Sequence, residues 1–234
     1  MEVRRLFMGS MNGFLGDAMP FNGYAILHPD GVVLVDTAFG AVFGKGPSGA
    51  FVYGPDRWEW MARSTLAGLA DHDIEPGDVK YVINTHLGDH SGENYLFPDA
   101  TFIVQQPEVT WTRQNMPQEW LEPWDFPGAK LEQLQGEDAE ILPGITCLFT
   151  PGHTPGHQSV IAHADTGKHL FVGDAVYNSD IWDDLTTMTE EHPAWESQQG
   201  PGGYETWLAS AEKLRHASAD VVHFAHDTAI VHRH

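Results

Sequence analysis

Two histidines and an aspartate, His86, Asp89 and His90, stand within five residues, directly after the apolar segment 79–84. Neutral imidazole and carboxylate are natural ligands of zinc and similar ions. One histidine near the end of a strand is usually a surface or core residue. Three ligand-type side chains at this density, on a turn that follows a strand, favour a metal site.

Three later segments repeat the pattern of an apolar run followed by a ligand-type residue. His153 follows the run 145–149, Asp174 follows 169–172, and His226 follows 221–224. In layered α/β domains the ends of strands commonly gather at one edge, where sites form. The sequence therefore predicts one metal site from His86, Asp89, His90, His153, Asp174 and His226.

The elements that must position these residues can be predicted from short runs rich in Val, Ile and Phe and bounded by Gly, Pro and Asp. The predicted strands are 24–27, 32–35, 79–84, 101–104, 145–149, 159–162, 169–172 and 221–224. Helical stripes of apolar residues run from Trp58 to Leu69, with Asp56 and Glu59 resembling a capping box, and from Tyr204 to Leu214. Strands and helices mixed along the whole chain predict one layered α/β (α+β) domain over residues 1–234.

Aromatic residues concentrate in two segments without a clear period, 107–130 and 178–203. We expect each single tryptophan there to pack onto the core, although such loops taken together are also typical of the wall of an apolar pocket. The segment 38–56 is interpreted as either a lid or a dimer contact, so a homodimer stays open.

The charge excludes several classes of partner. The chain carries 12 basic and 33 acidic residues and a net charge of −21, which disfavours nucleic acid and anionic membranes. We find neither a membrane-length apolar run nor a signal peptide. The single cysteine, Cys147, lies in an apolar run that predicts a core strand, and its isolation fits a cytoplasmic protein.

With these motifs in place, the chain resembles the metallo-β-lactamase superfamily and is similar to its N-acyl-homoserine lactonase branch. The resemblance runs from Val33–Thr37 through Gly152–His157 and Gly173-Asp174 to His226-Asp227. It implies a four-layer αββα sandwich of metallo-β-lactamase type, with a site for two metal ions in the groove between the sheets.

The resemblance also assigns roles. His86 and His153 would bind the first metal, Asp89, His90 and His226 the second, and Asp174 both. Tyr177 stands where the lactonases place a tyrosine that contacts the substrate, and Asp36 matches an aspartate that supports the site. Zinc is the first expectation for the two divalent ions, and the same ligands accept Fe, Mn or Co. His157 is interpreted as a partner of a ligand.

The implied activity is the opening of a lactone, with a small acyl lactone or ester as substrate. A hydroxide generated at the metals would attack the carbonyl, with Asp89 moving the proton and Tyr177 steadying the oxyanion. The nearest alternative is another ester or thioester hydrolase of the glyoxalase II kind. Such enzymes usually carry a basic glutathione-binding region, and this chain is poor in basic residues.

One departure from the family affects the metal site. The family motif is His-x-His-x-Asp-His, and the segment His86–His90 is one residue short and lacks the middle histidine. Three explanations stay open: the chain lacks this ligand, a modified residue is missing from the sequence as written, or Leu87-Gly88 forms an altered turn with fewer ligands. The departure keeps a different class open, a metal-poor relative that binds a ligand without turning it over.

Overall fold

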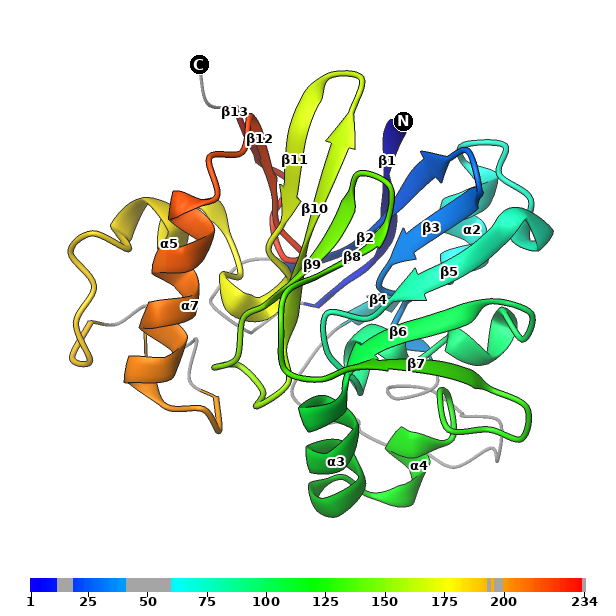
Figure 1. Ribbon diagram of the computed structural model, residues 1–234, viewed down its shortest axis with the longest axis horizontal. Helices are drawn as coiled ribbons and strands as arrows, with labels where there is room; N and C mark the ends of the chain where they lie inside the picture. The colour runs from blue at the N-terminus through cyan, green and yellow to red at the C-terminus, as the bar shows by residue number, and fades with distance from the viewer. Residues whose placement is uncertain (12–18, 41–59, 193–194, 196–199, 233–234) are drawn as a thin grey trace.

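The computed structural model describes residues 1–11, 19–40, 60–192, 195 and 200–232. Its strands form two sheets that follow one another in the sequence (Figure 1). The first sheet holds β1 (Glu2–Met11), β2 (Met19–His28), β3 (Gly31–Val35), β4 (Trp60–Ala62), β5 (Val79–Ile83), β6 (Thr101–Gln105) and β7 (Lys130–Leu134). The second holds β8 (Ala139–Leu142), β9 (Ile145–Phe149), β10 (Gln158–Ala164), β11 (Gly167–Phe171), β12 (Val221–His223) and β13 (Ile230–His232).

Both sheets are mixed. The first has the order β4-β1-β2-β3-β5-β6-β7, and its strands β3, β5, β6 and β7 are parallel. The second has the order β13-β12-β11-β10-β9-β8, and β11 and β12 are its parallel pair. Parallel strands carry their carboxyl ends to one edge of the sheet, so the residues after β5 share an edge with those after β3, and those after β11 with those after β12.

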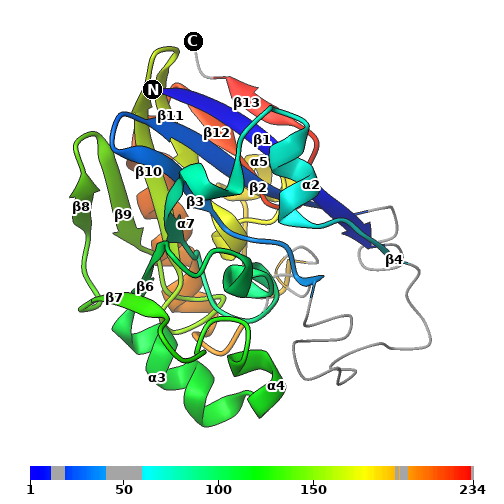
Figure 2. The ribbon, with the colours of Figure 1, turned by 90° about the vertical axis from the view of Figure 1, so that its right-hand side faces the viewer.

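The helices lie around the two sheets. They are α2 (Thr65–Ala70), α3 (Gln106–Asn115), α4 (Gln118–Leu121), α5 (Ser179–Asp184) and α7 (Tyr204–His216), with the short 3-10 turns η1 (Pro76–Asp78), η2 (Asp89–Ser91), η3 (Asn94–Leu96) and η4 (Gly173–Ala175). Figures 1 and 2 place α2 outside the first sheet and α5 and α7 outside the second. The layers are therefore helix, sheet, sheet, helix, the predicted αββα sandwich.

Apolar side chains fill all three spaces between these layers. Between the sheets, Ile26 and Val33 of the first pack with Val160 and Phe171 of the second. Leu69 of α2 packs with the outer face of the first sheet. On the far side, α5 and α7 pack with the outer face of the second sheet through the buried side chains Ile181, Trp182, Trp207, Ala211 and Leu214. Cys147 lies in the core between the sheets, as predicted.

The predicted strands are confirmed, apart from shifts of a few residues at their ends, and one predicted helix is partly wrong. Residues 60–62 form β4, which pairs with β1, and the helix begins only at Thr65, where the Ser64 side chain accepts a hydrogen bond from Leu66 N. The helical period of the apolar residues therefore spans a strand and the helix that follows it. The expected capping box at Asp56 and Glu59 lies outside the described residues, as does the part of the suggested lid from 41 to 56.

Tertiary packing also gives regular structure to the aromatic segments. Residues 106–115 and 118–121 are helical, and Trp124 packs in a small core with Leu87 and Val109. Trp182 and Trp195 pack beneath α7. The expectation that single tryptophans pack onto the core is thus confirmed for these three. Within the described ranges, no helix has the length and apolar character needed to cross a bilayer.

Candidate metal centre

Ligand-type side chains from both sheets meet in one place. The first sheet contributes residues that follow β5, and the second contributes residues that follow β9, β11 and β12. Three overlapping groups of ligand atoms each lie within 4.8 Å of one another. They are His86 with Asp89 and His90, His86 with His153 and Asp174, and His90 with Asp174 and His226. All six residues predicted from the sequence are therefore neighbours.

The group of His90, Asp174 and His226 is buried and held from behind. Nε2 of His226 lies 3.1 Å from Oδ1 of Asp174, while its Nδ1 is 3.0 Å from the carbonyl oxygen of Pro20. His90 is fixed in the same way, with Nδ1 2.8 Å from Oδ2 of Asp36 and Nε2 3.4 Å from Oδ1 of Asp174. Hydrogen bonding at Nδ1 directs Nε2 toward a ligand position, the usual arrangement for metal-binding histidines.

The group of His86, His153 and Asp174 is held less tightly. Nε2 of His153 lies 3.4 Å from Oδ2 of Asp174, and its Nδ1 is 3.5 Å from the hydroxyl of Tyr177, at the limit of a hydrogen bond. Nε2 of His86 is 3.0 Å from Oδ1 of Asp89. The His86 ring lies only 4.7 Å from that of His153 and 4.5 Å from that of His90, measured between centroids.

Asp36 joins the end of β3 to the segment that follows β5. Its φ of 65° lies in the left-handed region, which Asp and Asn tolerate better than most residues. In this conformation its carboxylate accepts hydrogen bonds from N and Oγ1 of Thr85, at 2.7 and 2.8 Å, besides the contact with His90. Asp36 thus contacts a candidate ligand from behind, in agreement with the supporting position that the resemblance implied.

His157 is placed to hold Asp174 rather than a metal. Its Nε2 accepts a hydrogen bond from the backbone N–H of Asp174 at 3.0 Å, and its Nδ1 is 3.1 Å from the carbonyl oxygen of Thr150. Burial lowers the pKa of His157 well below its usual value, so the ring is neutral and can accept this hydrogen bond. Gly173 permits the approach, because a Cβ there would lie 2.8 Å from Nε2 of His157.

The segment that is one residue short forms a tight turn. Gly88 has φ 106°, and a Cβ at this position would lie 2.8 Å from the Trp120 ring. Leu87 is buried in the core with Val109 and Trp124, so its side chain packs away from the ligand group. The turn therefore supplies His86, Asp89 and His90, and no fourth ligand-type side chain stands among its described residues.

Charges stabilise both carboxylates of the site in their ionised form. Burial alone would raise the pKa of Asp89, but the hydrogen bond from His86 and the charges of His86 and His90 lower it to about 2. Burial is likewise outweighed at Asp174, whose pKa the charges of His226 and His90 hold well below its usual range. Burial lowers the pKa of His153 to about 4, which leaves this ring neutral. Burial would lower the pKa of His90, but the charges of Asp174 and Asp36 raise it to about 10. Ionised carboxylates and neutral imidazoles are the forms that bind metals, so a metal ion at this position would displace the proton of His90.

This donor set fits divalent metal ions. It offers imidazole nitrogens and carboxylate oxygens that converge from two sheets. Among the described residues, Nε2 of His90 is buried and makes no hydrogen bond. It lies 3.4 Å from Oδ1 of Asp174, within the ligand group. A buried polar atom without a hydrogen bond is costly, and a metal ion would satisfy it. The His/Asp cluster thus supports binding of divalent metals.

Glu108, in the first turn of α3, lies beside the ligand segments and is not among the residues predicted from the sequence. Its side chain is buried, and it accepts hydrogen bonds from Leu87 N at 3.0 Å and Gly156 N at 3.2 Å. Acidic residues are common in the first turn of a helix, so the sequence carries no signal that separates this one from an ordinary exposed residue.

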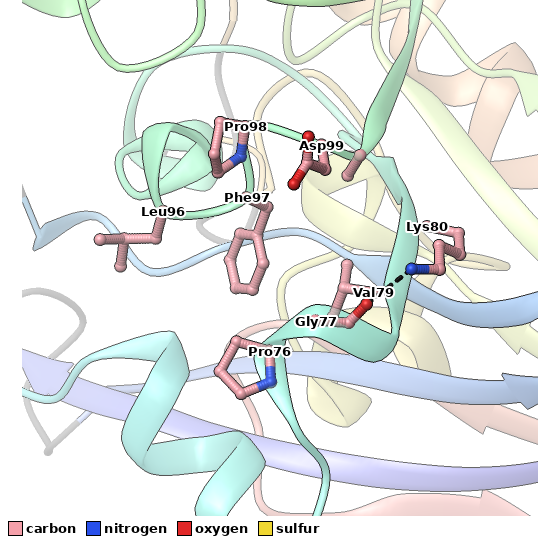
Figure 3. Close-up of a pocket in the computed structure, with 9 residues that line it drawn as sticks. Pro76, Gly77, Val79, Lys80, Leu96, Phe97, Pro98 and Asp99 are labelled. Carbon is pink, nitrogen blue, oxygen red and sulfur yellow. Dashed lines mark hydrogen bonds between the residues drawn. The ribbon is translucent and has the colours of Figure 1, made fainter.

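One other pocket of the described surface lies apart from the ligand group. The pocket in Figure 3, of about 170 Å³, is lined by Lys80, Phe97 and Asp99, and the ammonium of Lys80 donates a hydrogen bond to the carbonyl oxygen of Gly77. It lies at the amino end of β5, whereas the ligand group follows its carboxyl end.

Comparisons with known proteins agree with this geometry. The family model described as the metallo-beta-lactamase superfamily matches residues 17–226. The N-acyl homoserine lactonase AttM of Rhizobium radiobacter is 32% identical over 201 residues, which cover 78% of this chain and 74% of that protein. The N-acyl homoserine lactonase of Bacillus thuringiensis is 28% identical over 218 residues, covering 89% and 82%.

Solved structures show the same similarity. An N-acyl homoserine lactone hydrolase with the product N-hexanoyl-L-homoserine bound at its catalytic metal centre is 26% identical to this chain. It superposes with a TM-score of 0.74, over 97% of this chain and 93% of that structure.

Proposed function

Because this chain belongs to the metallo-β-lactamase superfamily, we propose that it is a metal-dependent hydrolase that opens N-acyl-homoserine lactones or closely related lactones. The observation that carries the proposal is the meeting of six ligand-type side chains from two sheets around Asp174. The relatives named as N-acyl homoserine lactonases support the choice of substrate. A role in quorum quenching would follow from that substrate.

We assign two divalent ions to the site, with zinc first and Fe, Mn or Co as alternatives. His86 and His153 would hold one ion, Asp89, His90 and His226 the other, and Asp174 both. When bound, the ions would lower the pKa of water and polarise the lactone carbonyl.

Asp89 and Tyr177 would act on the substrate in different ways. The pKa of Asp89, lowered to about 2, keeps its carboxylate ionised at neutral pH. Its oxygens would accept the proton that the attacking water loses and pass it to the leaving alkoxide. Burial raises the pKa of Tyr177 well above its usual value, so its hydroxyl stays a donor and can hydrogen-bond the developing oxyanion. The ring of Tyr177 lies against His153 and His226, between the two halves of the ligand group.

The direct experiment is a panel of acyl-homoserine lactones of increasing chain length, followed with a pH indicator, on protein whose metal content has been measured. We expect about two metals per chain, ring opening, and loss of activity on chelation that added metal reverses. Inactivity on every lactone in metal-loaded protein would contradict the proposed substrate. Activity on a glutathione thioester instead would favour the glyoxalase II-like alternative.

A non-catalytic relative is the second candidate, favoured by the short turn at Leu87-Gly88. Insertion of a histidine between these residues tests it. If the missing ligand disables the site, the insertion should raise both metal content and lactonase activity. If the native chain is already loaded and active, the insertion should add little.

We further propose that residues 1–234 form one domain, because the two sheets share a core. A cytoplasmic location is a separate proposal. A homodimer remains a proposal that sedimentation would test.

A further inference from the structure

A buried carboxylate next to the ligand group has no part in the chemistry proposed above. Glu108 lies in the first turn of α3 and is 0% exposed. Its two carboxylate oxygens accept from different loops: Oε1 from Leu87 N at 3.0 Å and Oε2 from Gly156 N at 3.2 Å. Burying an ionised group is expensive, so a carboxylate retained here needs compensating hydrogen bonds.

The two loops that Glu108 joins are those that carry His86 and His153. Leu87 directly follows His86, and Gly156 stands three residues after His153. These two histidines form one ligand group with Asp174, and their rings are 4.7 Å apart. Since His86 comes from the first sheet and His153 from the second, their separation depends on how the two loops are held together.

Close packing strengthens this link. A Cβ on Gly156 would lie 2.0 Å from the backbone nitrogen of Glu108, so the loop after β9 rests directly on the first turn of α3. Leu87 packs with Val109, the next residue of the same helix. Both loops are therefore positioned against the amino-terminal turn of α3.

We propose that Glu108 is a positioning residue that sets the affinity of the metal position formed by His86, His153 and Asp174. The proposal rests on the proposed metal-dependent function. The position of His90 and His226 has separate support, from Asp36 and the carbonyl oxygen of Pro20, and does not depend on Glu108.

The substitution Glu108→Gln tests the role at nearly constant volume. A glutamine has one acceptor oxygen, so its amide N–H₂ would face one of the two backbone N–H groups. The measurement is binding of Co²⁺, followed by absorption and by metal analysis after dialysis at defined free metal. It is made in two backgrounds. The His226→Ala background retains the metal position of His86 and His153, and the His153→Ala background retains the metal position of His90 and His226.

We expect Glu108→Gln to weaken Co²⁺ binding about 10–100-fold in the His226→Ala background, the range found for supporting partners of ligands. In the His153→Ala background we expect Co²⁺ binding to weaken by no more than about twofold, which is the deviation from additivity usual for independent sites. The matched control is Glu93→Gln, which alters another buried carboxylate that accepts from a backbone N–H, Thr65 N at 2.6 Å, and faces α2. It should lower the melting temperature without changing either affinity.

Equal weakening in both backgrounds, or a lower melting temperature with unchanged Co²⁺ affinity, overturns the role of Glu108 and leaves the proposed function intact. Wild-type protein that binds no Co²⁺ overturns both. If the glutamine variant does not fold, Glu108→Asp keeps the charge but is too short to reach both N–H groups, and the same selective loss is expected.

Discussion

The backbone N–H of Asp174 donates a hydrogen bond to Nε2 of His157 at 3.0 Å. The carboxylate at the centre of the ligand group is thus held through its own main chain. His157 in turn is fixed by Thr150, whose carbonyl oxygen lies 3.1 Å from its Nδ1. A histidine that uses both ring nitrogens in this way cannot also bind a metal, although it lies among histidines that are suited to do so.

Replacing His157 by phenylalanine should therefore loosen the whole centre. The ring volume is kept, but the buried N–H of Asp174 loses its acceptor, at a cost of about 1–3 kcal/mol of unfolding free energy. We expect weaker metal binding at both positions, measured by metal analysis and calorimetry. His28→Phe is the control. This buried histidine lies at the carboxyl end of β2, whereas Pro20, which contacts His226, lies near its amino end, and it contacts the carbonyl oxygen of Pro143. A stability loss without any change in metal affinity would contradict the role given to His157.

Asp36→Asn should act on one half of the centre. Asparagine tolerates the left-handed backbone at φ 65° but brings only one acceptor oxygen to Thr85 and His90. We expect the affinity of the His90 position to fall about 10–100-fold. Asp73→Asn is the control, because Asp73 also has a positive φ of 54° but is exposed. Unchanged metal affinity in the Asp36 variant would exclude this supporting role.

Tyr177→Phe should separate catalysis from metal binding. The hydroxyl lies 3.5 Å from Nδ1 of His153 and is assigned to the oxyanion, so its loss should lower kcat by about 10²-fold. Metal content should stay unchanged. Tyr204→Phe, which removes a hydroxyl that donates to the carbonyl oxygen of Met188, should leave kcat as it is. A Tyr177 variant that loses metal in proportion to its activity would instead place the hydroxyl in metal retention.

The sequence located the candidate ligands well because each follows an apolar run with a Gly, Pro or Asp boundary. Their convergence could be predicted as well, because the ends of strands in layered α/β domains commonly gather at one edge. The supporting contacts were harder to predict. Glu108 and the carbonyl oxygen of Pro20 contact the ligand segments across long stretches of chain, and no local pattern encodes such contacts. The strand 60–62 was missed because its pairing with β1 is likewise non-local.

Acid should destabilise the protein through a histidine pair away from the ligand group. His223 is buried against Phe171, with Nε2 2.8 Å from Nδ1 of His169. Burial, together with the charges of His169, Arg5 and His232, lowers the pKa of His223 to about 3. The unfolded chain binds this proton below about pH 6.5 and the folded chain only near pH 3, so stability falls as the pH drops through that window.

The measurement is the unfolding free energy, obtained from urea titrations at several pH values between about pH 7 and pH 4. His223→Phe keeps an aromatic ring beside Phe171 and removes the titrating group, so its pH dependence should be shallower. His163→Phe, at an exposed position of β10, should leave the slope unchanged. Equal slopes in wild type and the His223 variant would assign the acid sensitivity to other groups.

The two sheets divide the chain without interleaving, the first ending at Leu134 and the second beginning at Ala139. Each contiguous half therefore carries only part of the ligand set: His86, Asp89 and His90 in one, His153, Asp174 and His226 in the other. A metal ion bound by ligands from both halves would cross-link two contiguous segments of the chain. If the polypeptide were nicked between Leu134 and Ala139, the ion would add to the shared apolar core in holding the two fragments together, as an inorganic counterpart of a disulfide bridge.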